Sequence, residues 1–283
     1  MKFKVIALWC LCSVMPVKAQ EFLSPLVTDF EQHFQAVLAE QDIPGGAYAI
    51  VYKDQIIRAG GFGVREKGSE QPVDPYTVFR IASVSKTFAA GLASILASRG
   101  HFKWDEAVTH YIPDFAFKSN QYTRQLKIEH LLSQSTGVMP NAYDNMIEAN
   151  MLPERILPHF KKLDPMCQPG QCYGYQNVLF SLIEPIMQQT THSDYASLLQ
   201  QNIFKPLQLP TASVGLEAFL NTENRAMPHV KALGHWRNTQ VQESYYRFAA
   251  AAGVNASAMD LGYWLIAQLG YKPDVLSTDL LQQ

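Results

Sequence analysis

Ser83 and Lys86 are spaced for nucleophilic catalysis, because residues three positions apart lie on the same face of a helix. A serine hydroxyl is a weak nucleophile at its own pKa. A lysine whose ammonium group is desolvated can lose its proton and then accept the hydroxyl proton. Ser83 is therefore a candidate acyl-enzyme nucleophile and Lys86 its candidate base. Because about one Ser-x-x-Lys is expected by chance in a chain of this length, the assignment depends on the rest of the sequence.

A second polar cluster contains Tyr175 and Asn177, two residues apart and directly before an apolar stripe of helical spacing. Tyr175 could relay protons if cationic groups lay near its phenol, and Asn177 could donate to a substrate amide while ordering Lys86. The alternative is a packed tyrosine and a helix-capping asparagine. The cluster by itself leaves both interpretations open.

Apolar spacing predicts the elements that must position these residues. Residues 25–41 have the helical period, and residues 46–52 and 56–64 are two β-rich runs that form a hairpin. From Ser85 the pattern is helical again. Ser83 is thus expected at a helix N-terminus, where backbone N–H groups and the helix dipole favour a developing oxyanion.

The later sequence is predicted to be mostly helical. Apolar stripes indicate one helix over residues 178–186 and another over residues 258–269, and strand signals are few up to about residue 256. With 47% hydrophobic and only 17% charged residues, the chain can bury a large core. A net charge of -2 provides no positive field that would attract a phosphate backbone, so a nucleic acid partner is not expected.

Residues 1–19 have the pattern of a cleaved signal peptide: two lysines, an apolar run over residues 5–15 and a small-residue site ending at Ala19. Cleavage there would leave Gln20 first and place the protein in the periplasm or outside the cell. The alternative is a core helix or a membrane anchor, although the run is short for a bilayer span. No later run is long enough, so we expect no integral membrane span in the mature chain.

Two of the four cysteines lie in this leader, and Cys167 and Cys172 remain. A pair on either side of a Pro-Gly turn in an exported chain suggests a disulfide, with two free thiols as the alternative. A metal site is not favoured, because no second cysteine pair or spaced histidine pair accompanies the two cysteines. No cofactor or metal is expected.

Five segments then occur in a characteristic order. They are Phe79–Phe88, His130–Val138, Gly174–Asn177, Ile203–Leu207 and Ala252–Leu261. Together they strongly resemble the class C β-lactamases and the related serine D,D-peptidases and esterases of the penicillin-binding-protein superfamily. The resemblance covers nearly all of the mature chain.

The resemblance implies an α+β fold of the β-lactamase/D,D-peptidase type, with an antiparallel sheet flanked by helices and a mostly helical domain. Residues 20–283 would form this domain. The sheet part would cover about residues 20–80, the helical part about 81–256, and the start of a return segment 257–283.

The resemblance also implies roles: Ser83 is acylated, Lys86 assists removal of its proton, and Tyr175 and Asn177 take part in proton transfer and substrate binding. The Ser83 N–H would supply half of the oxyanion hole. Because no motif for a deacylating carboxylate is found, water activation would fall to Tyr175 and Lys86. Gln176 replaces a small residue and is expected to alter the rim of the site, whereas His130 is interpreted as structural.

The function expected from this resemblance is that of an exported serine hydrolase that opens β-lactam rings through a Ser83 acyl-enzyme. The alternatives are a D-alanyl-D-alanine peptidase or small-ester esterase of the same fold, and a truncated, non-catalytic penicillin-binding-like protein. The expected partner is a small β-lactam or a peptide ending in D-Ala-D-Ala, bound by a monomer.

One family element is not found in the sequence. Relatives carry a Lys-Thr-Gly or His-x-Gly motif on a strand that closes the site, whereas this sequence ends at Asp279–Gln283. We therefore expect an incomplete sheet, with an edge and an apolar face of the 46–64 hairpin uncovered. Loss of that strand's oxyanion donor would cost roughly a hundredfold or more in rate.

Overall fold

The computed structural model describes residues 17–282, and the chain divides into two compact units, residues 1–43 and 44–283. The first unit contains the helix α1 (Val17–Glu40), in which the rings of Phe30 and Phe34 stack at 5.9 Å. The predicted helix is confirmed, but it begins earlier than the apolar stripe and runs through Pro25, although a proline inside a helix removes one backbone hydrogen bond. The predicted signal peptide falls almost entirely on residues 1–16, which lie outside the described residues.

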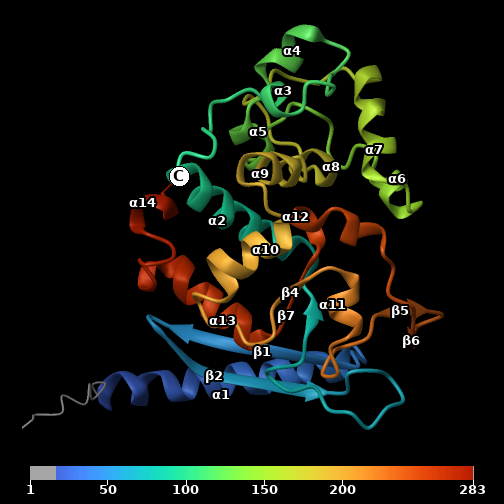
Figure 1. Cartoon of the computed structure of the whole chain (residues 1–283). Helices are drawn as coiled ribbons and strands as arrows, with labels where there is room; N and C mark the ends of the chain where they lie inside the picture. Colours follow the sequence, from blue (N-terminus) through green and yellow to red (C-terminus); the bar gives the residue numbers. More distant parts are fainter. Residues whose placement is uncertain (1–16, 283) are drawn as a thin grey trace, which may run out of the picture. The chain divides into compact units, whose positions relative to one another are not determined.

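The second unit begins with the predicted hairpin, which the structure confirms. Strands β1 (Gly45–Tyr52) and β2 (Gln55–Gly63) pair antiparallel across a tight turn in which Lys53 has a positive φ of 57°. Helix α13 (Ala258–Ile266) packs against this hairpin (Figure 1). The approach is close at Gly262, where a Cβ would lie 2.7 Å from Ile56.

A three-stranded sheet joins segments that are far apart in the sequence. Strand β7 (Val254–Ala256) lies between β3 (Phe79–Arg80) and β4 (Ser213–Val214), antiparallel to both. All three residues of β7 are buried. Strand β3 leads directly into the turn that carries Ser83, so this small sheet fixes where the candidate nucleophile lies.

Helix α2 (Ser85–Ser98) is the central element of the core and confirms the helix predicted from Ser85. It follows a single 3₁₀ turn, η1 (Ala82–Val84). Its buried Phe88 stacks on Trp264 of α13 with ring centroids 4.4 Å apart. Aromatic and aliphatic side chains are buried along most of the length of α2 and fix it rigidly, which suits a helix that carries the candidate base Lys86.

The remaining α-helices are short, and α9, α10, α12 and α14 pack against α2 (Figure 1). They are α3 (Val108–Tyr111), α4 (Asn120–Gln125), α5 (Ile128–Leu132), α6 (Asp144–Glu148), α7 (Pro153–Ile156), α8 (Asn177–Phe180), α9 (Ile183–Thr191), α10 (Tyr195–Leu199), α11 (Leu216–Leu220), α12 (Ala249–Ala252) and α14 (Thr278–Leu281). Some of them are connected by 3₁₀ segments, η2 (Leu157–Lys162) and η4 (Ser244–Arg247), and by π turns, η3 (Gln200–Phe204) and η5 (Ala267–Tyr271).

The single helix predicted over residues 178–186 is wrong in one respect, because the structure has two helices there. Helix α8 ends at Phe180 and α9 begins at Ile183. Pro185 explains the break: a proline has no N–H for the carbonyl four residues earlier and clashes with that turn, but it fits the first turn of a new helix. The apolar stripe runs through both helices, but the helical conformation is interrupted between Phe180 and Ile183.

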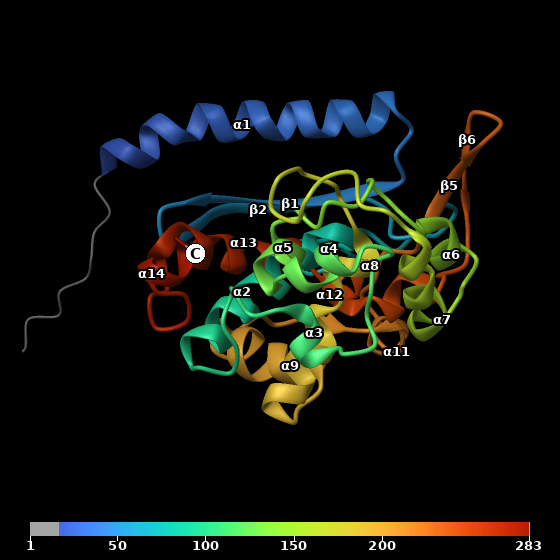
Figure 2. The same cartoon turned by 90° about the horizontal axis from the view of Figure 1, so that it is seen from above.

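A second hairpin was not predicted. Strands β5 (His229–Ala232) and β6 (His235–Asn238) pair across Leu233 and Gly234, both of which have positive φ, and the hairpin projects from the second unit in Figure 2. Two central residues with positive φ match the right-handed twist of the flanking strands. The stretch from 81 to 256 contains many short helices separated by loops, and it also contains short strands.

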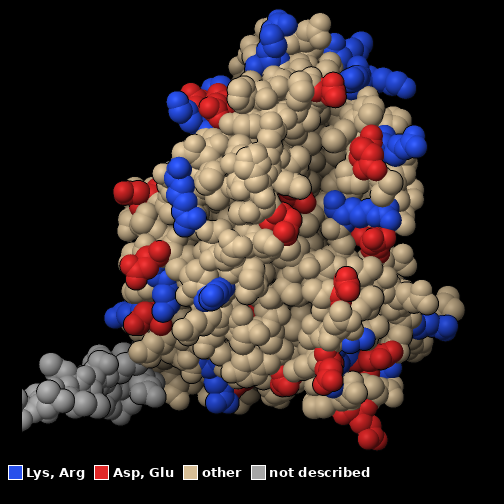
Figure 3. All heavy atoms as spheres, viewed as in Figure 1, with Lys and Arg blue, Asp and Glu red and all other residues tan. Residues whose placement is uncertain are grey.

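The mixed architecture of small antiparallel sheets and many helices confirms the predicted α+β class. Within residues 17–282, no helix combines the length and the apolar character that crossing a bilayer requires. Basic and acidic side chains alternate across the face drawn in Figure 3, and uncharged surface separates them.

Candidate active site

Ser83 lies on a strained turn between β3 and α2. Ala82, directly before it, has a φ of 45°, in the left-handed region that a residue with a Cβ seldom adopts. The N–H of Ile81 donates to Val254 O at 3.3 Å, which ties this turn to β7. The Ser83 side chain is exposed, and the N–H groups of a first helical turn have no partner within the helix. The nucleophile is therefore accessible beside an anion-stabilising backbone.

The structure brings three of the predicted site residues together at the Ser83 hydroxyl. Ser83 Oγ lies 2.5 Å from the phenolic oxygen of Tyr175, and Lys86 Nζ donates to Ser83 Oγ at 3.3 Å. Tyr175 comes from the loop before α8, 92 positions along the chain. Both groups that could take the hydroxyl proton are thus in place.

Lys86 is held by two further acceptors. Its Nζ donates to Asn177 Oδ1 at 2.8 Å and to the carbonyl oxygen of Ala251, in α12, at 3.0 Å. Helix α12 contacts both α2 and α8. The ammonium therefore has three acceptors for its three protons, which fixes the position of Nζ.

The surroundings of Lys86 favour the loss of its proton. Burial lowers the pKa of Lys86 from 10.5 to about 8, although the charge of Asp144 opposes the change. The rings of Tyr175 and Phe180 lie 4.7 Å and 5.3 Å from Nζ. A lysine with a pKa this close to neutrality can serve as a general base.

Asn177 connects Lys86 to Asp144, a residue that the sequence analysis did not single out. Asn177 Nδ2 donates to Asp144 Oδ2 at 2.8 Å. Burial raises the pKa of Asp144, whereas the bond from Asn177 and the charge of Lys86 lower it. A single acid at the start of a short helix has no sequence signal that marks it for a site, so only the structure reveals it.

Gln176 does not shape the rim of the site, and that expectation is wrong. Its side chain is fully buried: its N–H donates to Gln134 Oε1 at 2.6 Å, and its own amide donates to the Met139 carbonyl at 2.5 Å. Side chains alternate along an extended segment, so Gln176 points inward while Tyr175 and Asn177 on either side face Lys86. Gln176 anchors the loop that presents them.

Cys167 and Cys172 form a disulfide in the structure, with Cα atoms 6.3 Å apart. This loop is packed against the chain at Gly137, where a Cβ would lie 2.3 Å from the Cys167 carbonyl and φ is 84°. Gly137 is therefore required by both space and backbone conformation. The disulfide lies in the segment that leads to Tyr175.

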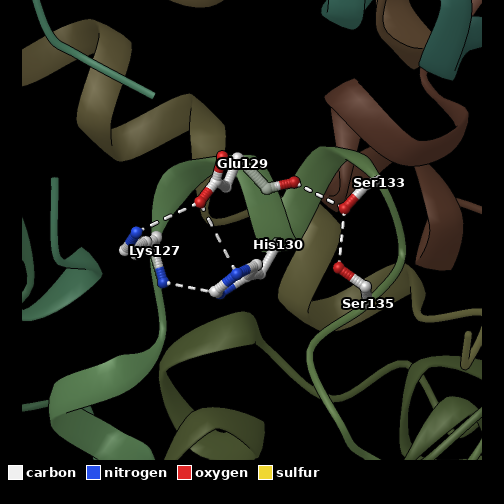
Figure 4. A network of polar contacts seen from close by, with 5 residues as sticks. All are labelled: Lys127, Glu129, His130, Ser133 and Ser135. Atoms are coloured by element: carbon white, nitrogen blue, oxygen red, sulfur yellow. Dashed lines mark hydrogen bonds and ion pairs between the residues drawn. The ribbon is translucent and has the colours of Figure 1, made fainter. Parts of the chain in front are cut away.

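His130 has a structural environment, as expected. Its Nδ1 accepts from the Lys127 N–H at 3.1 Å at the start of α5, and its Nε2 lies 3.6 Å from Glu129 (Figure 4). Ser133 and Ser135 bond to each other at 2.7 Å in the turn that follows. These contacts cap and close a short helix, and they involve none of the residues around Ser83.

The chain belongs to the β-lactamase family, because the family model described as beta-lactamase matches residues 30–283. This agrees with the expected resemblance to a serine β-lactamase-like family, and the fold is also that of a penicillin-binding protein homologue.

Individual relatives support the same class. A beta-lactamase of Psychrobacter immobilis is 28% identical over 68% of this chain and 46% of its own length. The protein flp of Staphylococcus aureus strain N315 is 25% identical over 91% of this chain and 52% of its own length. The chain thus spans about half the length of these curated relatives.

Solved structures share the fold at low sequence identity. An octameric penicillin-binding protein homologue from Pyrococcus abyssi superimposes with a TM-score of 0.80 at 21% identity, over 90% of this chain and 59% of that one. EstCE1, a hydrolase with promiscuous acyltransferase activity, gives 0.73 at 16% identity, over 87% of this chain and 73% of that one.

Proposed function

We propose that this protein is an exported serine hydrolase that opens β-lactam rings through an acyl-enzyme on Ser83. The observation that carries the proposal is the contact of one hydroxyl with two proton-accepting groups: Ser83 Oγ lies 2.5 Å from the Tyr175 oxygen and 3.3 Å from Lys86 Nζ. A serine needs such an adjacent base to act as a nucleophile.

Acylation follows from this geometry. Ser83 Oγ attacks the lactam carbonyl carbon while its proton passes to Lys86, which must be present as the free amine. The C–N bond of the ring breaks, the ring nitrogen takes the phenolic proton of Tyr175, and the Lys86 ammonium returns a proton to the phenolate. The backbone N–H of Ser83 stabilises the oxyanion of the tetrahedral intermediate.

Deacylation uses Lys86 and Tyr175 again, with the proton passing in the opposite direction between them. Tyr175 passes its proton to the Lys86 amine, and the phenolate removes a proton from a water that attacks the Ser83 ester. The C–O bond of the ester breaks and Ser83 recovers its proton from Lys86. Asn177 holds Lys86 throughout and offers its amide to the substrate.

A second candidate function is the hydrolysis of small acyl esters, because the same nucleophile and base serve either leaving group. The similarity of the fold to EstCE1 favours this candidate. Cleavage of peptides ending in D-Ala-D-Ala is a third use of the same chemistry.

Turnover assays separate these substrates. The purified protein and a Ser83→Ala variant are given a chromogenic cephalosporin, a p-nitrophenyl ester and a peptide ending in D-Ala-D-Ala. The proposal predicts cephalosporin turnover by the parent alone. If the parent turns over the ester or the peptide faster than the cephalosporin, the proposed substrate class is wrong. Equal rates for the parent and Ser83→Ala would overturn the proposal.

Export through the leader at residues 1–19 is part of the proposal and has its own test. The mass of the protein recovered from the periplasm of an expressing bacterium should match a chain that begins at Gln20. Recovery of the uncleaved chain in the cytoplasm or membrane would contradict export.

A further inference from the structure

Asp144 is the first residue of α6 and lies behind the proposed catalytic residues. The residue before it, Tyr143, has a φ of 67°, and this left-handed turn starts the helix at Asp144. Its carboxylate accepts the Asn177 Nδ2 proton at 2.8 Å, and its other oxygen is buried without a hydrogen bond to any described residue. Among residues 17–282, the Asn177 amide is therefore the only hydrogen-bond donor to this carboxylate.

The carboxylate determines which way the Asn177 amide faces. An ionised carboxylate only accepts hydrogen bonds, so the nitrogen of the amide must point to Asp144. The amide oxygen then points to the Lys86 ammonium, which only donates, and the two atoms are 2.8 Å apart. If the amide turned over, both contacts would become unfavourable, with Nδ2 facing Lys86 and Oδ1 facing Asp144.

This orientation has a consequence for the nucleophile. Lys86 has three acceptors, namely Ser83 Oγ, Asn177 Oδ1 and Ala251 O. If Asn177 Oδ1 were lost, the flexible lysine would be held by only two, and its distance to Ser83 would no longer be fixed.

Charge gives Asp144 a second effect. Its negative charge favours the ammonium form of Lys86 and so limits the lowering of the Lys86 pKa that burial causes. Other ionisable groups that face this pair are Glu148 on the same helix, Tyr175 and Tyr245. Burial and the charges of Asp144 and Glu148 raise the pKa of Tyr245 to about 12.

We propose that Asp144 is a positioning residue: it orients the Asn177 amide, and through that amide it holds Lys86 Nζ against Ser83. The expected effect of Asp144 on the reaction rests on the proposed function, in which Ser83 is acylated. The orientation itself is a property of the resting protein, so it can be measured without a substrate.

The kinetic test uses Asp144→Asn, which keeps the size of the side chain and removes its charge. The variant amide can donate as well as accept, so the orientation of Asn177 is no longer enforced. We expect the acylation rate constant on its high-pH plateau to fall by about ten- to a hundredfold. The acidic limb should move to lower pH by on the order of one unit.

Glu148→Gln is the matched control, because it removes one charge from the exposed end of the same helix without touching Asn177. It should leave the plateau within about twofold, as other surface changes do. Rate constants are taken from the fraction of protein that can be acylated, so that unfolded protein lowers the amplitude and not the rate. If Asp144→Asn changes neither plateau nor limb, or behaves as Glu148→Gln does, the proposal is wrong.

NMR of the resting protein separates this inference from the proposed function. In Asp144→Asn, the Lys86 side chain should titrate at lower pH than in the parent, and the side-chain NH2 protons of Asn177 should exchange faster with water. Unchanged titration and exchange would overturn the role of Asp144. If both change while the parent forms no acyl-enzyme, the positioning role stands and the proposed reaction fails.

Discussion

At the scale of single residues, the site places one lysine between two opposing influences. Burial favours the neutral amine that can accept the Ser83 proton, and Asp144 favours the ammonium. The balance leaves the pKa of Lys86 at about 8, so a useful fraction of the amine is free near neutral pH.

This balance predicts the pH dependence of acylation. Below about pH 8 the acylation rate constant should rise roughly tenfold per pH unit, because the free amine is the reactive form and its fraction grows with pH; above about pH 8 it should level off. Stopped-flow measurement of acylation between pH 5 and 10 checks this. Lys86→Arg keeps the charge but cannot lose its proton, so it should acylate at least about a hundred times more slowly. A flat profile in the parent would rule out Lys86 as the base.

Tyr175 gives a second prediction at this scale. Tyr175→Phe keeps the ring near Lys86 but removes the oxygen that lies 2.5 Å from Ser83 Oγ. Deacylation should slow by about a hundredfold or more, because the phenol is assigned to water activation. Mass spectrometry should then detect an accumulating acyl-enzyme. If the variant deacylates as fast as the parent, that assignment is wrong.

Sequence reasoning reached the residues that have a characteristic spacing. Ser83 and Lys86 are three apart, and Tyr175 and Asn177 are two apart, so each pair can be found in a single window. Asp144 and the Ala251 carbonyl could not be found, because a single acid and a backbone oxygen carry no pattern. Their roles arise only when the chain folds and brings α6 to Asn177 and α12 to Lys86.

At the scale of elements, the position of the nucleophile depends on the contact of α2 with β7. Ser85 is fully buried at the start of α2, and its Oγ accepts the N–H of Val254 at 3.0 Å. This bond and the Ile81 contact with the same strand hold the turn that contains Ser83.

Ser85→Ala should therefore destabilise the protein. The change leaves the Val254 N–H buried without an acceptor, which costs about 1–3 kcal/mol. For a chain of this size, that corresponds to a fall in Tm of roughly 2–4 °C for each kcal/mol. Ser98→Ala, at the exposed end of the same helix, is the control and should change stability by less than about 0.5 kcal/mol. Equal Tm values for Ser85→Ala and the parent by calorimetry would show that this contact is dispensable.

A buried carboxyl joins α9 to α12 and gives stability a pH dependence. Glu184 accepts the Ala250 N–H at 2.7 Å, and burial raises the pKa of Glu184 from 4.5 to about 8. The folded protein then holds a proton that the unfolded chain has already released. Its contribution to stability is therefore complete below about pH 4.5 and is lost as the pH rises towards 8.

Glu184→Gln removes this dependence and keeps an oxygen that can accept from Ala250. The variant should resemble the parent near pH 5 and be more stable near pH 8, by about 2–4 kcal/mol. Denaturant unfolding at both pH values measures the difference, with the exposed Glu154→Gln as the control. A variant that is less stable than the parent at pH 8 would contradict the account.

Helices and strands could be predicted where the apolar period of the sequence matches an uninterrupted stretch of helix or strand. The hairpin at the start of the second unit and α2 have clear patterns and were found. The stripe over residues 178–186 is periodic, but Pro185 divides it into two helices. The hairpin of β5 and β6 was missed because its strands are four residues each and mostly polar.

At the scale of the whole molecule, the β-lactamase family model covers residues 30–283, and the fold is shared with solved structures of a penicillin-binding protein homologue and a hydrolase. The curated relatives are about twice as long as the region they share with this chain. Family and fold follow from these matches. The proposed reaction depends on the small group of side chains around Ser83.

The most direct measurement is intact mass spectrometry of the purified protein, and of its Tyr175→Phe variant in which deacylation is slowed, after incubation with a penicillin. We predict a single adduct with the mass of the penicillin, which peptide mapping places on Ser83 and which Ser83→Ala does not form. An adduct on neither the folded parent nor the Tyr175→Phe variant, or an equal adduct on Ser83→Ala, would contradict an acyl-enzyme on Ser83.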